Sequence, residues 1–223
     1  MADARPSPGE LARRGFLDTA RAVRFLDSPV LAAIPSAALL GPLSTTAEPD
    51  VALLALVRLG EGGCDLASLA NGEPERWARL VRVLGASRWA GDQIVADPSL
   101  VEALTAPEID QPFWKVYERV AELVGPYLGN GGDLVGGTTA LRRFYRREML
   151  SILSADLELS EPGMDAARAA MPRVAAAISR LVGASLDGAL RIARALHPEA
   201  DGYPFSVVSM GKTGGEELNY ISD

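Results

Sequence analysis

The feature that most constrains this chain is the near absence of strand-like alternation before residue 200. Apolar residues instead recur at spacings of three and four positions, which is the pattern of helices that bury one face. Prolines and glycine pairs separate these periodic segments and mark the expected helix ends. The sequence therefore predicts a mainly α-helical domain over residues 1–200.

The clearest helices are predicted over residues 138–157 and 165–196. The first follows a glycine-rich break at residues 129–137 and begins near Thr138, which can serve as its cap. Its expected buried stripe is Leu141, Phe144, Tyr145, Met149 and Ile152. Pro172 lies inside the second pattern and, because it lacks a backbone N–H, is expected to kink or restart that helix.

Composition excludes several classes of protein. A net charge of −7 over 223 residues argues against non-specific nucleic-acid binding, which requires clustered positive charge. The apolar stretches are too short or too interrupted by proline to span a membrane, and no signal peptide is recognised at Met1. Cys64 is the only cysteine, which excludes an internal disulfide framework and a cysteine-based zinc site. We therefore expect a cytoplasmic protein without nucleic-acid or membrane partners.

The last residues depart from the helical pattern. Phe205–Met210 is predicted to be a strand, and Tyr220 is expected to begin a second one that reaches Asp223. A glycine turn that contains Gly211 and a polar helical turn lie between them. This strand–turn–strand predicts that residues 201–223 start an α/β domain of which the chain holds only the first part.

A glycine turn after a strand is typical of phosphate binding, but two common patterns do not fit. A P-loop requires a glycine five positions before Gly211, where Ser206 stands. The spacing of the glycines also differs from that of a dinucleotide-binding fingerprint. The pattern that fits is that of a nucleotidyltransferase: a strand, two glycines, a short helix and an aspartate on the next strand. The simpler alternative is a glycine turn followed by a surface aspartate.

The residue types explain the chemistry expected of a nucleotidyltransferase. Gly214 and Gly215 would allow the backbone to approach the phosphates of a nucleotide and to offer amides to their oxygens. Asp223 would bind Mg²⁺, normally with a second acidic residue two positions further on, so that two metal ions polarise the phosphorus and the leaving oxygen. Because that second acid would follow residue 223, the chain alone is expected to be inactive.

The segment Ser209-Met-Gly-Lys-Thr-Gly-Gly-Glu-Glu-Leu-Asn-Tyr-Ile-Ser-Asp223 closely resembles the signature of the glutamine synthetase adenylyltransferase family. Members of this family are bifunctional and also act as adenylyl-tyrosine phosphorylases, and they typically have Gly-Met-Gly-Lys-Leu-Gly-Gly-Arg-Glu-Leu-Asn-Phe-Ser-Ser-Asp. Two further stretches resemble the family in the same order, one at residues 83–98 and one in the arginine-rich run at residues 141–150. Three residues depart from the signature: Thr213, Glu216 and Ile221.

The resemblance implies that residues 201–223 begin the first of two nucleotidyltransferase copies. In the family, this copy removes AMP from a tyrosine of glutamine synthetase by phosphorolysis and releases ADP. Asp223 would be the first metal ligand, Gly214 and Gly215 would approach the nucleotide phosphates, and Lys212 and Ser222 match the signature. The implied cofactor is Mg²⁺, and the implied partners are glutamine synthetase, ATP or ADP, phosphate and a PII-type signalling protein. The alternative is a non-catalytic helical module with a regulatory or partner-docking role.

The remaining candidates receive structural interpretations. His197, beside a proline at a helix end, is expected to be a cap, and Cys64 has no neighbouring base in the sequence that would activate it. One side of a predicted helix carries four arginines: Arg142, Arg143, Arg146 and Arg147. They could bind phosphate or an acidic partner, but we expect a solvated or salt-bridged face. Three tryptophans at helical core spacings are expected to pack inside: Trp77, Trp89 and Trp114.

Overall fold

A computed structural model describes residues 6–105, 108–129, 131–200 and 202–220. Within these ranges the chain is helical and contains no β-strand, which confirms the prediction of a mainly α protein. Two compact units are distinguished, Met1–Thr105 and Ala106–Asp223, and each is described by itself. None of the helices in the described ranges combines the length and the apolar character that a membrane span requires. The boundary predicted at residue 200, between helical and catalytic domains, stays a prediction.

The first unit is built from short helices whose ends follow proline and aspartate signals. Pro49 and Pro74 occupy first-turn positions of two of them, where a missing N–H costs nothing, and the side chains of Asp18 and Asp65 cap two others. The elements are α1 (Pro8–Arg13), α2 (Thr19–Leu26), η1 (Pro29–Leu31), α3 (Ser36–Thr45), α4 (Pro49–Glu61), α5 (Leu66–Gly72), α6 (Pro74–Ala86), α7 (Arg88–Ala96) and η2 (Pro98–Ala103).

The core of this unit lies between α4 and α6, where leucines at three- and four-residue spacings are fully buried. These residues are Leu53, Leu56, Leu59, Leu80 and Leu84. Trp77 is 1% exposed, and its indole N–H donates to the carbonyl oxygen of Ala38 at 2.8 Å, which joins α6 to α3. The packing predicted for Trp77 is therefore confirmed. Trp89 and Trp114 are 43% and 47% exposed, so the same prediction is wrong for them: their helices leave much of each ring in contact with solvent.

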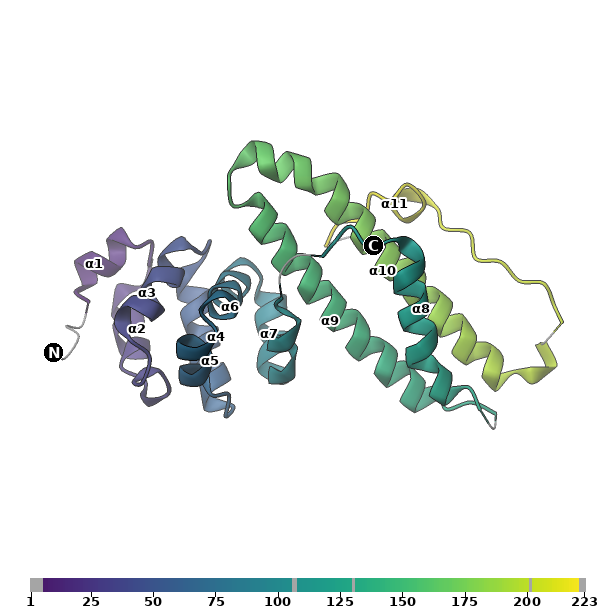
Figure 1. Ribbon diagram of the computed structural model, residues 1–223. Coiled ribbons are helices and arrows are strands. Elements are labelled where there is room, and N and C mark those ends of the chain that lie inside the picture. The colour runs from purple at the N-terminus through teal and green to yellow at the C-terminus, as the bar shows by residue number, and fades with distance from the viewer. Residues whose placement is uncertain (1–5, 106–107, 130, 201, 221–223) are drawn as a thin grey trace. The chain divides into compact units, whose positions relative to one another are not determined.

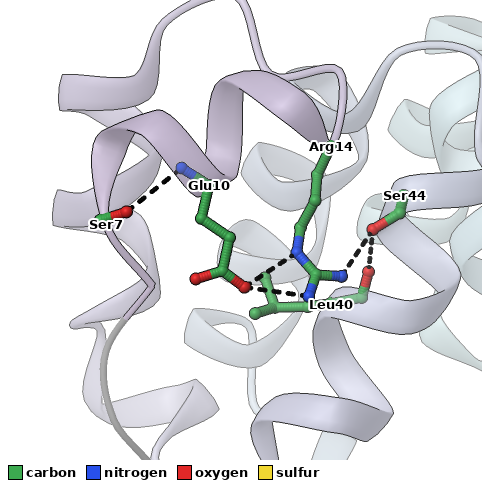
Figure 2. Close-up of polar contacts among 5 residues, drawn as sticks. All are labelled: Ser7, Glu10, Arg14, Leu40 and Ser44. Atoms are coloured by element: carbon green, nitrogen blue, oxygen red, sulfur yellow. Dashed lines mark hydrogen bonds and ion pairs between the residues drawn. The ribbon is translucent and has the colours of Figure 1, made fainter.

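A polar cluster at the start of the first unit joins α1 to α3 (Figure 2). The hydroxyl of Ser7 caps α1 by accepting from the amide of Glu10 at 3.2 Å. Arg14 donates to the carboxylate of Glu10 at 3.0 Å and to the hydroxyl of Ser44 at 3.2 Å. Ser44 in turn donates to the carbonyl oxygen of Leu40. The guanidinium therefore fixes the first helix against the third.

The second unit is dominated by two long antiparallel helices, α9 and α10, which lie side by side with α8 against them (Figure 1). Its elements are α8 (Phe113–Val124), η3 (Gly125–Tyr127), α9 (Leu134–Ser160), α10 (Met164–Leu196), η4 (Pro198–Ala200) and α11 (Gly211–Gly214). The stripe predicted for α9 is confirmed, because Leu141, Met149 and Ile152 are buried and the two aromatic residues pack against the clusters around them. We call α9 and α10 together the hairpin.

One boundary prediction in the hairpin is wrong. Helix α9 begins at Leu134, capped by the side chain of Asp133, so it includes part of the predicted glycine-rich break. A side chain at Gly137 would lie 2.9 Å from the side chain of Ile192, so glycine here permits close packing of α9 on α10. Helix α10 continues through Pro172 as one element, so the helix does not restart there, and the predicted kink stays a prediction. The buried side chains of Ala170 and Val174 on either side of Pro172 support this continuity.

The strand predicted at Phe205–Met210 is not formed among the described residues. Residues 204–210 are extended but have no neighbouring strand, and Phe205, Val208 and Met210 are exposed. A strand requires a partner to satisfy its backbone groups, and the described helices offer none. Figure 1 shows this segment as an extended chain that leaves the end of α10 and returns to α11. Of the second predicted strand, Tyr220 lies in a turn and the remainder lies outside the described residues.

Candidate functional site

The glycine turn predicted after residue 210 is present and forms a single helical turn, α11 (Gly211–Gly214). The amide of Glu217 donates to the carbonyl oxygen of Lys212 at 2.8 Å, and the amide of Glu216 donates to that of Thr213 at 3.4 Å. This pair of bonds is a Schellman motif, which ends a helix with one residue in the left-handed region. That residue is Glu216, with φ of 56°, a conformation that usually favours glycine.

The two glycines predicted to approach a phosphate have different roles in the fold. A side chain at Gly214 would collide with the backbone carbonyl oxygen of Ser209, so the turn itself requires glycine there. At Gly215, an added Cβ would lie 3.5 Å from the carbonyl oxygen of Gly211, which is an ordinary contact, and φ is −85°. The turn therefore tolerates a side chain at Gly215, which is exposed and whose amide donates to the carbonyl oxygen of Gly211 at 3.0 Å.

Of the remaining predicted site residues, Lys212 lies on the turn and the other two lie outside the described residues. The side chain of Lys212 is exposed on α11. Ser222 and Asp223 lie outside the described residues, so their assignments stay predictions. In the described part of the chain, no three histidine, cysteine or acidic side chains gather into a group that could hold a metal ion. Asp223 therefore remains the metal-ligand candidate from the sequence.

The residues after the turn return to the hairpin. Leu218 is 6% exposed and packs in a cluster with Met149 and Ile152 of α9 and Ile178 of α10. The amide of Leu218 donates to the hydroxyl of Ser179 on α10 at 3.4 Å. The signature segment is thus attached to the helices at a buried position.

A second attachment lies two residues further along. The phenol of Tyr220 donates to the carboxylate of Asp156 on α9 at 3.0 Å. Burial, and then the neighbouring carboxylate of Asp156, raise the pKa of Tyr220 far above its ordinary value. The phenol therefore stays protonated and available as a donor at every physiological pH.

Sequence reasoning did not identify Asp156 or Ser179. Their partners, Tyr220 and Leu218, lie 64 and 39 residues away in the chain, and neither residue belongs to a recognisable motif. The available signal was weak: both are polar positions within otherwise apolar stretches of a long helix. Such a position predicts a buried hydrogen bond without naming its partner.

The arginine face of α9 agrees with the expected solvated surface. The side chains of Arg142, Arg143, Arg146 and Arg147 are all exposed. Two of them, Arg143 and Arg147, also interact with other groups of the protein. The sequence did not predict an ion pair that involves the next residue of α9, Glu148. Arg119 on α8 binds the carboxylate of Glu148 through two bonds, of 2.5 and 2.9 Å, and stacks 5.1 Å from the ring centre of Phe144.

His197 and Cys64 have the structural roles expected of them. His197 is the C-cap of α10, its amide donates to the carbonyl oxygen of Arg194, and its ring lies 3.0 Å from the carboxylate of Glu199. Partial burial, and then Asp65, raise the pKa of the Cys64 thiol, which disfavours the reactive thiolate. Neither residue has the surroundings of a catalytic group.

Comparison with known proteins agrees with the resemblance of the signature segment. The family model described as glutamate-ammonia ligase adenylyltransferase matches residues 77–223. A relative from Streptomyces avermitilis is 36% identical over 225 residues, which cover 96% of this chain and 20% of that protein. Another, from Bifidobacterium longum subsp. infantis, is 33% identical over 98% of this chain and 21% of its own length. Both are bifunctional glutamine synthetase adenylyltransferase/adenylyl-removing enzymes.

The match covers most of this chain but a small part of its relatives. The chain spans about a fifth of the length of these curated relatives. No solved structure matches it. Because the family model covers well over half of the chain, including the turn, Leu218 and Tyr220, the chain belongs to the glutamate-ammonia ligase adenylyltransferase family.

Proposed function

We propose that this chain is part of a cytoplasmic enzyme that controls glutamine synthetase by attaching AMP to one of its tyrosines and removing it. We further propose that residues 201–223 belong to the site that removes AMP. Family membership carries the first proposal. The second rests on the helical sequence that precedes the signature, as in the first of the family's two copies. The exposed backbone at Gly215, where the fold does not require glycine, supports a role in close approach to a phosphate.

In the proposed phosphorolysis, an oxygen of inorganic phosphate forms a bond to the phosphorus of the adenylyl group. The bond from that phosphorus to the tyrosine oxygen breaks, and the proton lost by the attacking phosphate is taken up by that oxygen. The products are ADP and the free tyrosine side chain. The exposed backbone at Gly215 would lie against the phosphates, and the exposed ammonium of Lys212 would offset their negative charge.

We propose Asp223 as a ligand of Mg²⁺, with Ser222 beside it in the signature. A carboxylate oxygen is the donor that this ion prefers, so the residue type fits the ion. When bound, Mg²⁺ would supply polarisation of the phosphorus and stabilisation of the leaving oxygen. The chain would supply this carboxylate three residues after Tyr220, in the segment that Leu218 and Tyr220 attach to the hairpin.

The proposal also includes the strand that the described residues do not form. A strand formed by the extended segment would carry Phe205 and Val207 on one face and Val208 and Met210 on the other. Both faces would therefore be mostly apolar. Strands that are apolar on both faces are typical of sheets covered by helices on both sides. This pattern supports the assignment of residues 205–210 to the interior of an α/β nucleotidyltransferase sheet. ATP as a substrate and a PII-type signalling protein as a regulator are proposed from the family resemblance.

The experiment requires a protein that carries this chain together with a complete catalytic domain. Adenylylated glutamine synthetase should release ADP when phosphate and Mg²⁺ are present, and Asp223→Asn should abolish that release. Asp165→Asn is the matched control, because Asp165 is a fully exposed carboxylate in the first turn of α10. Unchanged turnover in Asp223→Asn would refute the ligand assignment. Binding of glutamine synthetase without any ADP release in the wild type would favour the alternative of a non-catalytic docking module.

A further inference from the structure

We infer that Asp156 and Ser179 are positioning residues: they fasten the signature segment to the hairpin and so hold the turn that contains Gly215 in place. The inference rests on the function proposed for Gly215 in approaching a nucleotide phosphate. It concerns the residues of α9 and α10 that touch Leu218 and Tyr220 and do not themselves contact substrate.

Ser179 is suited to hold a backbone amide and is not merely a polar residue in a core. Its side chain is 6% exposed, and its hydroxyl donates to the carbonyl oxygen of Ala175 at 2.9 Å. The hydroxyl proton is therefore committed to the helix, and the oxygen presents a lone pair to the amide of Leu218. A buried amide without an acceptor is unfavourable, so this contact selects one position for the segment.

Asp156 plays the corresponding role on the other helix. One carboxylate oxygen accepts from the hydroxyl of Ser160 at 3.3 Å, and the other accepts from the phenol of Tyr220 at 3.0 Å. The carboxylate is half-buried, and both of these donors are hydroxyl groups. Its orientation toward Tyr220 is therefore fixed by hydrogen bonding.

The two contacts lie on different helices and on either side of Asn219. The segment is thus held across the hairpin at two points, with the side chain of Leu218 buried between the helices. Gly215 precedes Leu218 by only three residues, and the amide of Glu217 between them donates to the carbonyl oxygen of Lys212 at 2.8 Å, so the turn follows the position of the anchored leucine. Reacting groups displaced by about 1 Å can lose about a hundredfold in rate. The anchoring therefore limits where the turn can be.

The first test measures the anchoring without any catalysis, in the 223-residue chain. Amide hydrogen exchange at Leu218 should become about 3- to 10-fold faster in Ser179→Ala, because one hydrogen bond is lost. Ser185→Ala is the matched control, since the hydroxyl of Ser185 also bonds to its own helix, at 2.8 Å to Leu181, and among the described residues it has no hydrogen bond to the signature segment. Unchanged exchange in Ser179→Ala, or an equal change in Ser185→Ala, would overturn the inference.

The second test measures the consequence in a protein with the complete catalytic domain. Tyr220→Phe removes only the hydroxyl, and its control is Tyr145→Phe, a partly buried tyrosine that packs against the cluster containing Leu218. Tyr220→Phe and Asp156→Ala should lower kcat about 10- to 100-fold. Asp156→Asn keeps an oxygen that can accept from the phenol and should recover part of the rate.

The outcomes separate this inference from the proposed function. Faster exchange with unchanged kcat would overturn the positioning role and leave the proposed function standing. Loss of kcat in Tyr220→Phe but not in Tyr145→Phe, with rescue by Asp156→Asn, would support it. A wild-type protein that releases no ADP would refute the proposed function and with it the catalytic consequence, while the exchange experiment would still decide whether Ser179 holds the segment.

Discussion

Replacing Leu218 with alanine is expected to release the signature segment from the hairpin without unfolding the helices. Leu218 is the only buried residue among residues 202–220. Burial of a leucine side chain contributes about 1.5–3 kcal/mol. The hydrogen bonds to Ser179 and Asp156 contribute about 0.5–1.5 kcal/mol each, which brings the favourable sum to about 2.5–6 kcal/mol. Ordering the backbone of Leu218–Tyr220 costs about 1–2 kcal/mol per residue, or about 3–6 kcal/mol in total.

These opposing contributions agree to within a few kcal/mol, so the attachment depends on the leucine side chain. Leu218→Ala removes most of the apolar contribution and should shift the segment to a detached state. Hydrogen exchange followed by mass spectrometry should then show the peptide over residues 211–220 exchanging almost as fast as an unfolded chain. The melting temperature should change by less than about 3 °C, because the helices keep their own core.

Leu150→Ala provides the matched control within α9. Leu150 is fully buried, and its truncation should lower the free energy of unfolding by about 2–5 kcal/mol and the melting temperature by several degrees. Two results would contradict the reasoning for Leu218. One is a fall in melting temperature as large as that of Leu150→Ala, and the other is unchanged exchange at residues 218–220.

Three further predictions concern the turn and one ion pair. Gly214→Ala should disrupt α11, seen as faster amide exchange at Glu217, whereas Gly215→Ala should leave that exchange unchanged and lower ADP release about tenfold or more in a protein with the complete catalytic domain. Glu216→Gly should slow the same exchange, because it relieves a left-handed φ that costs a non-glycine residue about 1 kcal/mol. The hydrogen bond from Arg173 lowers the pKa of Asp110, so its stabilisation should be complete above the ordinary aspartate pKa and lost as pH falls through the lower folded pKa. Urea unfolding should therefore show Asp110→Asn less stable than wild type at pH 6, with a difference that shrinks as the pH falls below the ordinary aspartate pKa; equal stability at pH 6 would contradict this.

The helical part of the fold was predictable wherever a helix buries a single apolar face. The stripe from Leu141 to Ile152 follows directly from three- and four-residue spacing, because those positions face α10 and α8. Local signals failed where tertiary packing outweighed them. Gly137 does not interrupt α9 because the close approach of Ile192 requires a residue without a side chain, and Pro172 does not divide α10 because both flanks are packed.

The candidate site was predictable in its residue types but not in its supports. Glycines, a lysine and an aspartate in a fixed order indicate nucleotide chemistry, since each type has one physical reason to be present. The spacing could not distinguish Gly214 from Gly215, because the collision with Ser209 depends on how the chain folds back. Nor could it identify Asp156 and Ser179, whose importance arises only when a long hairpin brings them to the end of the chain.

The residues that follow α11 are attached to the hairpin, whereas the extended segment that precedes α11 is not. After the turn, Leu218 and Tyr220 are bound to the hairpin; before it, the backbone of Phe205–Met210 has no neighbouring strand in the described part of the chain. The close contact between Gly214 and Ser209 links these two sides, so the end of the extended segment and the turn move together. A sheet that bound residues 205–210 would therefore fix the turn from its free side. The exposed backbone at Gly215 would then lie between two rigid supports, which is the preorganisation that transfer of a phosphorus group requires.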